Sequence, residues 1–532
     1  MDELTSYWNS LAENSALLLV VMPLVGALLV RVMGVSGKET TYFTALTNVW
    51  LTTALGAIML VRFEASELRE SGASLKSIQI ASSLEWLGSR EPDQSDEAAE
   101  TPNKRRRVLG PDIRFDVGVC RLSLWSILIV TATTLACVST IPIDDVRLVS
   151  RLSWLLITES ALIGTFAAQD TMLLAFFIEL SAVGLFFLAG MSSGLQHREA
   201  ARRFFRVQLV SGALLLIGLT GLTGAHWWMQ HSTSDPNPPL SFFLPGIVQG
   251  IPDLSYSSES AHGYWEVVSP WLFTLLVAGL VLRVLLVPLH ASWLRLVDHG
   301  DRTVLALTAA GSLPFGFYAA ARFVVPVFPE MTGEIGFRLM IWSVAAGVAL
   351  SLMTLTAPTH RRRIGLAVLA AGSVSFGAAF LDHPLAEQGG LLLAVGASGS
   401  AAALFLLVPE KTAMPGPAGQ QTRANIAKPV YWALSVCAVA GLAWLPLSGS
   451  FWGGLMVVQA VFNRNSTAAF FLIGAVLCLS VAMPALLRTQ SDDSPSTGQT
   501  NVDQPRLVAL LPLIVILTWI ALAPNAVTGP AN

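Results

Sequence analysis

SWLLITESALIGTFAAQDTMLLAFFIELSAVGLFFLAG, residues 153–190, decides how the rest of the chain must be organised. A membrane-crossing helix needs about 20 apolar residues, so this stretch can cross a bilayer twice, with a bend available near Gln169 and Asp170. Glu179 lies in the middle of the second crossing, between apolar neighbours. A charge at the bilayer centre costs about 2.5–3.5 kcal/mol on insertion scales. Glu179 is therefore expected to face protein or water and to have a partner.

The composition is that of an integral membrane protein. Of the 532 residues, 53% are hydrophobic and 13% are charged, whereas a soluble globular chain carries about 25% charged residues. A net charge of −3 argues against nucleic acid as a partner. The four cysteines are scattered, and the chain has no GxGxxG motif. We therefore expect no catalytic residue, metal site or cofactor site, and the acidic N-terminus indicates a retained first helix rather than a cleaved signal peptide.

Apolar runs of spanning length predict an all-α polytopic protein with about fourteen transmembrane helices in contact with the lipid bilayer. The expected spans are residues 15–34, 41–62, 120–141, 151–168, 171–190, 204–224, 269–290, 303–326, 336–357, 363–381, 388–408, 431–462, 468–488 and 506–524. The twelfth run is interrupted by LPLSGS at residues 445–450, where Pro446 and Gly449 should break the helix. Such breaks are tolerated where neighbouring helices or a cavity satisfy the backbone.

The charges of the loops predict the orientation. Lysine and arginine gather after expected helices 5, 7, 9 and 11, whereas the alternate loops are acidic or nearly free of basic residues. Because cytoplasmic loops carry the basic excess, both termini are expected outside the cytoplasm, in an inner (plasma) membrane. Residues 63–119 form an extracytoplasmic loop whose polar part, 87–112, is interpreted as a flexible insertion. Residues 489–532 are a polar linker followed by a final helix.

The seventh expected helix supplies a partner for Glu179. WLFTLLVAGLVLRVLLVPLHASWLRLVDHG, residues 271–300, places Arg283 in mid-membrane, where an arginine almost always pairs or faces a cavity. The other deep carboxylate is Glu159. A buried ion pair can also do no more than fix helix register, since such pairs often add no net stability. Glu159 can equally be a simple polar contact between helices.

Pro288, near the end of the same helix, removes a backbone hydrogen bond and leaves carbonyl groups available to an ion path. His290 and His299 follow it. Each histidine can belong to a proton relay, although a solvated or capping histidine is the more common case at a helix end.

Several motifs together resemble the antiporter-like proton-channel subunits of respiratory complex I, most closely the M type (mitochondrial subunit 4 type). They are the stretch 153–190, FDVGVCRLSLW (115–125), PLHASWL (288–294), ARFVVPVFPE (321–330) and LPLSGSFWGG (445–454). They occur in the order of that family and run through most of the chain. The same fold serves sodium/proton antiporters, membrane-bound hydrogenases and a bicarbonate-uptake system.

The resemblance implies two inverted five-helix repeats, helices 4–8 and 9–13, with broken helices 7 and 12. The expected organisation is helices 1–2 in residues 1–62, the loop 63–119, helix 3 in 120–150, the two repeats in 151–326 and 336–488, and the linker with its helix in 489–532. Glu179 takes the position of the family's helix 5 glutamate and Arg283 that of its helix 7 lysine. The proline–leucine–histidine motif is intact at Pro288 and His290.

The chain departs from the family at its other ionisable positions. The helix 8 lysine falls at about Pro314, the helix 11 histidine on Ala397 and the helix 12 acid or lysine at about Gly454. Lysine in an apolar site can titrate, whereas arginine effectively cannot. The central line of ionisable residues is thus degenerate, and protons would have to cross by water chains alone.

The sequence therefore predicts a membrane-arm subunit of a proton-translocating NADH:quinone oxidoreductase, which contributes to or structurally supports proton translocation. Its partners would be other membrane-arm subunits, and NADH, FMN, iron–sulfur clusters and quinone would bind to those partners, with no redox chemistry in this chain. One alternative is the membrane subunit of a cation/proton antiporter or of a bicarbonate-uptake complex. The other is a scaffold subunit that conducts no ions.

Overall fold

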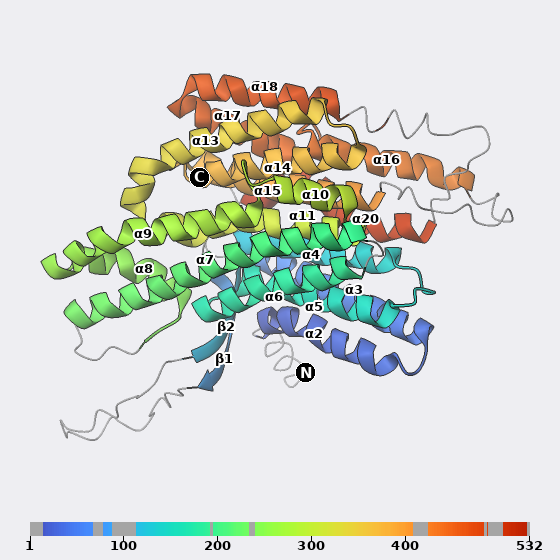
Figure 1. The fold of residues 1–532 in the computed structure, drawn as a ribbon, viewed down its shortest axis with the longest axis horizontal. Coiled ribbons are helices and arrows are strands. Elements are labelled where there is room, and N and C mark those ends of the chain that lie inside the picture. The colour runs from blue at the N-terminus through green and yellow to red at the C-terminus, as the bar shows by residue number, and fades with distance from the viewer. Residues whose placement is uncertain are drawn as a thin grey trace.

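The computed structural model describes residues 14–67, 78–87, 113–191, 195–233, 240–407, 424–483, 487 and 504–528. Helices dominate this part of the chain, and most of them run along the long axis of the molecule (Figure 1). Nine of the helices in the described ranges are long and apolar enough to cross a membrane. The fold is therefore that of a mostly helical, multi-pass membrane protein.

The helices of the first part of the chain are α2 (Ser15–Met33), α3 (Lys38–Glu67), α4 (Arg121–Thr140), α5 (Leu148–Ala167), α6 (Thr171–Gly190), α7 (Leu195–Thr233), α8 (Leu244–Ser255), α9 (Glu259–Val284), α10 (Ala291–His299), α11 (Arg302–Ala319), the π-helix η1 (Ala320–Val324) and α12 (Val325–Val327). The later helices are α13 (Pro329–Leu355), α14 (His360–Ala378), α15 (Pro384–Leu407), α16 (Ala424–Leu442), α17 (Gly449–Arg464), α18 (Ser466–Ala482), α20 (Gln504–Leu522) and α21 (Pro524–Thr528). Helix α7 is longer than its apolar run at 204–224, because its polar first and last turns continue the helix beyond the hydrophobic stretch.

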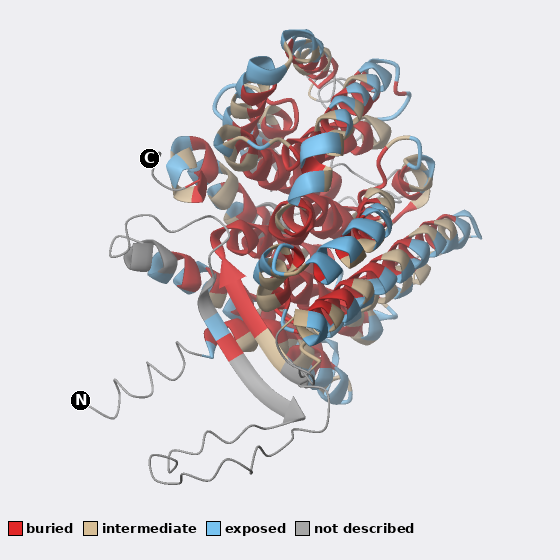
Figure 2. Cartoon of the chain, turned by 90° about the vertical axis from the view of Figure 1, so that its left-hand side faces the viewer, coloured by how far each residue is buried: buried red, intermediate tan, exposed pale blue. Residues whose placement is uncertain are grey.

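Three helices form the centre of the bundle. The most apolar windows of α4, α11 and α15 are 94%, 100% and 100% buried, compared with 39% for α2 and 44% for both α7 and α13. These three helices pack against one another. A helix with neighbours on all sides needs no polar face. Figure 2 shows buried helical segments in the middle of the bundle and exposed residues on the outer sides of the surrounding helices. The outer helices supply the surface that faces lipid or a neighbouring subunit.

The chain is not entirely α-helical, which corrects the expected all-α fold. β1 (Ile78–Leu87) and β2 (Ile113–Cys120) pair antiparallel, with Ala81 opposite Gly118. The two strands lie on either side of the polar part 87–112 of the predicted loop 63–119, and only that polar part was interpreted as a flexible insertion. In β2, IRFDVGVC, apolar residues alternate with polar or small ones, which is the period of a strand. Residues 88–112 of the polar insertion and residues 489–503 of the linker lie outside the described residues.

The bend predicted near Gln169 is confirmed, and the β2 strand holds it in place. The Gln169 amide donates to the Asp116 carbonyl of β2 at 2.9 Å, and the Leu244 amide, at the start of α8, donates to the Gln169 carbonyl at 2.8 Å. Asp170 then caps α6, because its carboxylate accepts hydrogen bonds from the amides of the first turn. The turn between α5 and α6 is therefore fixed on both sides, which sets where α6 begins.

Two helices are interrupted inside the bundle. α9 ends at Val284, and Leu285 takes a left-handed conformation (φ 61°) before α10 begins at Ala291. α16 ends at Leu442, and α17 begins at Gly449 after a turn that contains two further non-glycine residues at positive φ. Pro288 lies in the first break, and Pro446 lies in the second, whereas Gly449 is the first residue of the helix that follows. A non-glycine residue in the left-handed backbone conformation destabilises the fold by about 1–3 kcal/mol, so it persists only where the surrounding structure imposes that conformation.

Candidate functional site

Glu179 lies on α6 and fits against a glycine of α7. Its side chain is half-buried. A Cβ atom built on Gly212 would lie 1.4 Å from the Glu179 Oε1 atom and 2.5 Å from its Cδ atom. The carboxylate therefore fills the space that any other residue at 212 would occupy. This close approach fixes the position of the charge relative to α7.

Arg283, on α9, is 2% exposed and reaches α6 next to Glu179. Its Nη2 donates to the Ile178 carbonyl at 3.1 Å and to the Ser181 hydroxyl. Its Nε and Nη1 atoms have no hydrogen-bond partner within the described ranges. Two hydrogen bonds from α7 hold the end of α9 that carries it: Gln208 Nε2 to the Arg283 carbonyl and Ser211 Oγ to the Gly279 carbonyl. The guanidinium is thus held rigidly in the interior.

The predicted pairing of Glu179 with Arg283 is present as proximity, without direct contact. In the part of the chain that the structure describes, the two side chains form no ion pair within 4.0 Å. The guanidinium instead binds the residues on either side of Glu179 along α6, within one helical turn of it. Their charges still act on each other through this short separation. The arrangement leaves the Glu179 carboxylate free of a fixed partner.

Glu159, on α5, is the most isolated acidic group. It is 0% exposed, and neither carboxylate oxygen has a hydrogen-bond partner among the described residues. The neighbouring Ser160 hydroxyl donates to the Val20 carbonyl of α2 at 2.6 Å, which fixes α5 against α2. An ionised carboxylate without a partner is expensive in such surroundings. Glu159 therefore does not act as the counter-ion of Arg283 in this conformation.

The two histidines lie at opposite ends of α10. His290 immediately precedes α10, two residues after Pro288, and its Nδ1 atom is buried without a partner in the described part of the chain. His299 is the last residue of the helix. The break between α9 and α10 thus brings His290 toward the interior and leaves His299 at the helix end.

The second half of the bundle has a neutral interior. Among the described residues, the buried charged side chains are Arg121, Glu159, Asp170, Arg283 and Arg322. All of them precede α13, and Pro314, Ala397 and Gly454 lie on α11, α15 and α17 as uncharged positions.

Buried hydroxyl groups lie on the same helices as the three uncharged positions, α11, α15 and α17. Ser312, Ser400 and Ser450 are at most 2% exposed. A Cβ on Gly396 would lie 2.5 Å from the Ser450 Oγ atom, and one on Gly441 would lie 2.0 Å from the Ser400 Oγ atom. The Oγ atoms of Ser312 and Ser450 have no partner among the described atoms. Such hydroxyls can bind water but cannot carry a charge, because the serine hydroxyl does not ionise at physiological pH.

A second buried arginine was not assigned a role from the sequence. Arg322, in the π-helix η1, donates through Nη1 to the Cys120 Sγ atom at 2.8 Å and through Nη2 to the Gln169 Oε1 atom at 2.6 Å. Its guanidinium also lies 5.7 Å from the centre of the Tyr318 ring. These contacts join η1 to the start of α4 and to the α5–α6 turn. The sequence feature that could have indicated its burial is the position of Arg322 near the end of the apolar run 303–326.

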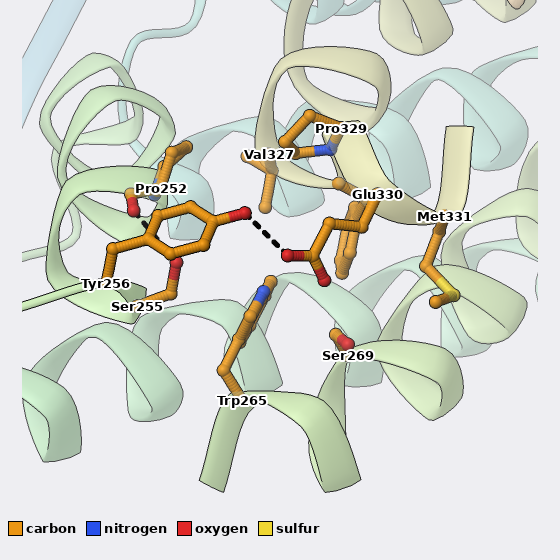
Figure 3. A pocket seen from close by; sticks show the side chains of 10 residues that line it. Pro252, Ser255, Tyr256, Trp265, Ser269, Val327, Pro329, Glu330 and Met331 are labelled. Atoms are coloured by element: carbon orange, nitrogen blue, oxygen red, sulfur yellow. Dashed lines mark hydrogen bonds between the residues drawn. The ribbon is translucent and has the colours of Figure 1, made fainter. Parts of the chain in front are cut away.

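A small cavity opens where α8, α9 and α13 meet (Figure 3). The Tyr256 hydroxyl donates to the Glu330 carboxylate at 2.5 Å, and this bond raises the pKa of Tyr256. The volume of the cavity is about 10 Å³, which is about the space of one water molecule. The cavity is lined by Pro252, Ser255, Tyr256, Trp265, Ser269, Val327, Phe328, Pro329, Glu330 and Met331. It is too small to hold an organic substrate.

The comparison with known families agrees with this arrangement. Residues 168–481, more than half of the chain, match the NADH:quinone oxidoreductase/Mrp antiporter transmembrane family. The chain belongs to this family. The match begins at the α5–α6 turn and includes Glu179, Arg283 and both helix breaks.

Two curated relatives are similar to this chain over part of their length. The chain is 26% identical over 257 residues to F(420)H(2) dehydrogenase subunit N of Methanosarcina mazei, covering 46% of this chain and 47% of the relative. It is 25% identical over 341 residues to NADH-quinone oxidoreductase subunit M of Rhodobacter capsulatus, covering 60% and 61%. The chain thus spans about half to three fifths of these two relatives. The second relative supports the resemblance to the M type.

A solved structure shows the same fold over nearly the whole chain. A chain of respiratory complex I from Thermus thermophilus with bound NADH superposes with a TM-score of 0.73 at 16% sequence identity. The superposition covers 96% of this chain and 97% of that chain. At this identity the likeness concerns the fold alone.

Proposed function

We propose that this chain is an antiporter-like membrane-arm subunit of a proton-translocating, complex I-like oxidoreductase. The observation that carries the proposal is the buried Arg283 guanidinium, which is held on α6 within one turn of the half-buried Glu179. Ionisable residues inside a membrane default to functional roles, because burying them is expensive. The family membership of the chain supports the same role.

Arg283 and Glu179 act as an electrostatic switch in this proposal, rather than as two proton carriers. Arginine keeps its proton under working conditions, so Arg283 supplies a fixed positive charge. Glu179 lies beside the outer face of α6, where Phe176 is 58% exposed. A charge change in a neighbouring subunit can therefore act on Glu179 directly. Glu159, His290 and His299 are proposed as further members of the path.

We assign the fourteen expected crossings to α2–α7, α9 with α10, α11 with η1 and α12, α13–α15, α16 with α17, α18 and α20. We assign α5–α12 and α13–α18 to two inverted repeats. The similar placement of the two breaks supports this assignment, because each contains a proline and at least one non-glycine residue at positive φ. Both termini would lie outside the cytoplasm of an inner membrane, as the loop charges predict.

The redox chemistry belongs to partner subunits in this proposal, with NADH, FMN, iron–sulfur clusters and quinone bound there. A second candidate is a scaffold that conducts no protons, which the neutral interior of α11, α15 and α17 favours. A cation/proton antiporter or a bicarbonate-uptake subunit is the third, because the matched family also covers Mrp antiporters.

The test is purification of the tagged full chain in mild detergent, with its partners identified by mass spectrometry and NADH:quinone activity measured. Flavin and iron–sulfur subunits that co-purify with activity would support the oxidoreductase. Recovery with small antiporter subunits alone, or with a single soluble partner, would contradict it.

Proton translocation by the purified assembly in vesicles then separates conduction from scaffolding. Glu179→Gln should reduce pumping in a conducting subunit and leave a scaffold unaffected. Glu199→Gln, on the exposed surface of α7, is the matched control for loss of a carboxylate.

A further inference from the structure

A basic cavity lies between α7, α9 and α10. Its volume is about 480 Å³, within the range of small-molecule sites in proteins. Its walls come from Arg203, Arg206, Val207, Val210, Leu282, Ala291, Ser292 and Arg295. Three of these eight residues are arginines and three have branched apolar side chains. The cavity thus combines a cationic part with an apolar part.

The cationic part has free hydrogen-bonding capacity. Arg206 and Arg295 are exposed, and Arg295 makes no hydrogen bond or ion pair with any residue that the structure describes. Arg206 uses Nε for a long bond, 3.4 Å, to the Arg202 carbonyl, which leaves both of its terminal amino groups free. Arg203 is paired with Glu199. Two guanidinium groups are therefore available to an anionic ligand, and arginine binds phosphate oxygens well through two parallel donors.

The apolar part continues along the outer surface of α7. Arg203, Arg206, Val210 and Ile217 follow one another at spacings of three, four and seven residues, which places them on one face of the helix. Val210 is 53% exposed and Ile217 is 56% exposed. The arginines thus lie at the end of a membrane-spanning helix, immediately before the apolar surface that faces lipid.

We infer that this cavity binds one anionic phospholipid, with the phosphate on Arg206 and Arg295 and an acyl chain along Val207, Val210 and Leu282. Basic pockets between transmembrane helices on the cytoplasmic side suit anionic headgroups. A free phosphate would leave the apolar wall without a ligand. An acidic peptide would place unsatisfied backbone groups against that wall, which is unfavourable in a membrane. The inference requires that α7 spans the membrane and is independent of proton transport.

The experiment is native mass spectrometry of the full chain in mild detergent, after addition of phosphatidylglycerol or phosphatidylcholine. The native chain should retain one phosphatidylglycerol and no phosphatidylcholine. The double variant Arg206→Gln/Arg295→Gln should bind phosphatidylglycerol roughly thirtyfold more weakly, since each basic residue near anionic lipid contributes a factor of about five. The matched control Arg31→Gln/Arg338→Gln removes two exposed arginines elsewhere and should bind like the native chain.

Further variants address folding and the identity of the ligand. Val210→Asn keeps both arginines and should weaken lipid retention through the apolar wall alone. Thermal unfolding of every variant identifies those that misfold. Arg206→Lys/Arg295→Lys keeps both positive charges and should bind phosphatidylglycerol more tightly than the double glutamine variant. Equal retention by the double variant and its control would overturn the inference. Displacement by inorganic phosphate alone, or occupation of the cavity by a co-purifying protein instead of lipid, would do the same.

Discussion

Gly212 should be the most sensitive small residue of the candidate site, because the Glu179 carboxylate occupies the volume of its absent side chain. In Gly212→Ala the new Cβ would lie 1.4 Å from Oε1. Contacts below 3.0 Å are essentially never observed, so the carboxylate must retreat by roughly 1.6 Å. Overpacking costs about 1–3 kcal/mol, and alanine returns about 1 kcal/mol of helix propensity. The net loss of stability is expected to be about 0–2 kcal/mol.

The effect on activity should exceed the effect on stability. A displacement of about 1 Å in a working group can reduce a rate by up to about a hundredfold. We therefore expect Gly212→Ala to slow proton translocation by about tenfold while the assembly remains folded. Proton uptake by vesicles that contain the intact assembly measures the first quantity, and thermal unfolding of the purified protein measures the second.

A matched glycine on the same helix provides the control. A Cβ on Gly224 would meet nothing within 4 Å, so Gly224→Ala should gain helix propensity without loss of activity. In a Glu179→Ala background, Gly212→Ala should become neutral or stabilising, because the colliding carboxylate is gone. A coupling of about 1–3 kcal/mol between the two positions is expected for residues in contact. Equal destabilisation by Gly212→Ala in both backgrounds would refute the reasoning.

Three further predictions concern the other polar groups. Arg283→Met should lower the free energy of unfolding by about 1–3 kcal/mol in denaturation experiments, since it removes the guanidinium that donates to the Ile178 carbonyl and to the Ser181 hydroxyl; an unchanged midpoint would contradict this. Glu159→Leu should leave the thermal midpoint unchanged or raise it, because the carboxylate oxygens have no partner in the described structure; a loss above about 1 kcal/mol would indicate an unseen partner. The pKa of Tyr256 is raised in the folded protein because its hydroxyl donates to Glu330. This hydrogen bond therefore stabilises the fold at pH values below the ordinary tyrosine pKa of about 10, and the stabilisation is lost as the pH rises through the raised pKa of the folded state. Unfolding midpoints of the native chain and of Tyr256→Phe should therefore converge at high pH, and a difference that grows with pH would be inconsistent with this bond.

Much of the fold could be predicted because membrane insertion depends on local composition. The apolar runs located most of the helices within a few residues, and the Pro446 break lies where the sequence placed it. The antiparallel pair β1–β2 was missed, since its short alternating pattern lies beside a long polar run. The ends of α7 were also missed, because a helix continues beyond its apolar segment where water can satisfy its side chains.

The contacts of the candidate site could be predicted less well. Proximity of Glu179 and Arg283 followed from their shared depth in the membrane, but the guanidinium binds Ile178 and Ser181. The role of Gly212 has no signature in the sequence, because it depends on which face of α7 meets α6. The same holds for Arg322, whose partner Cys120 is 202 residues away.

By itself, the sequence determined that this chain is a membrane protein, approximately where its helices lie, and that residues 311–321, 391–403 and 445–459 carry no charge. Each of these properties belongs to a contiguous stretch of residues. Only the tertiary structure decided which buried charges meet, which glycine receives the Glu179 carboxylate and which arginines share a cavity. Those outcomes depend on the rotation of each helix about its axis and on its neighbours, and both are set by packing between segments that lie far apart in the chain.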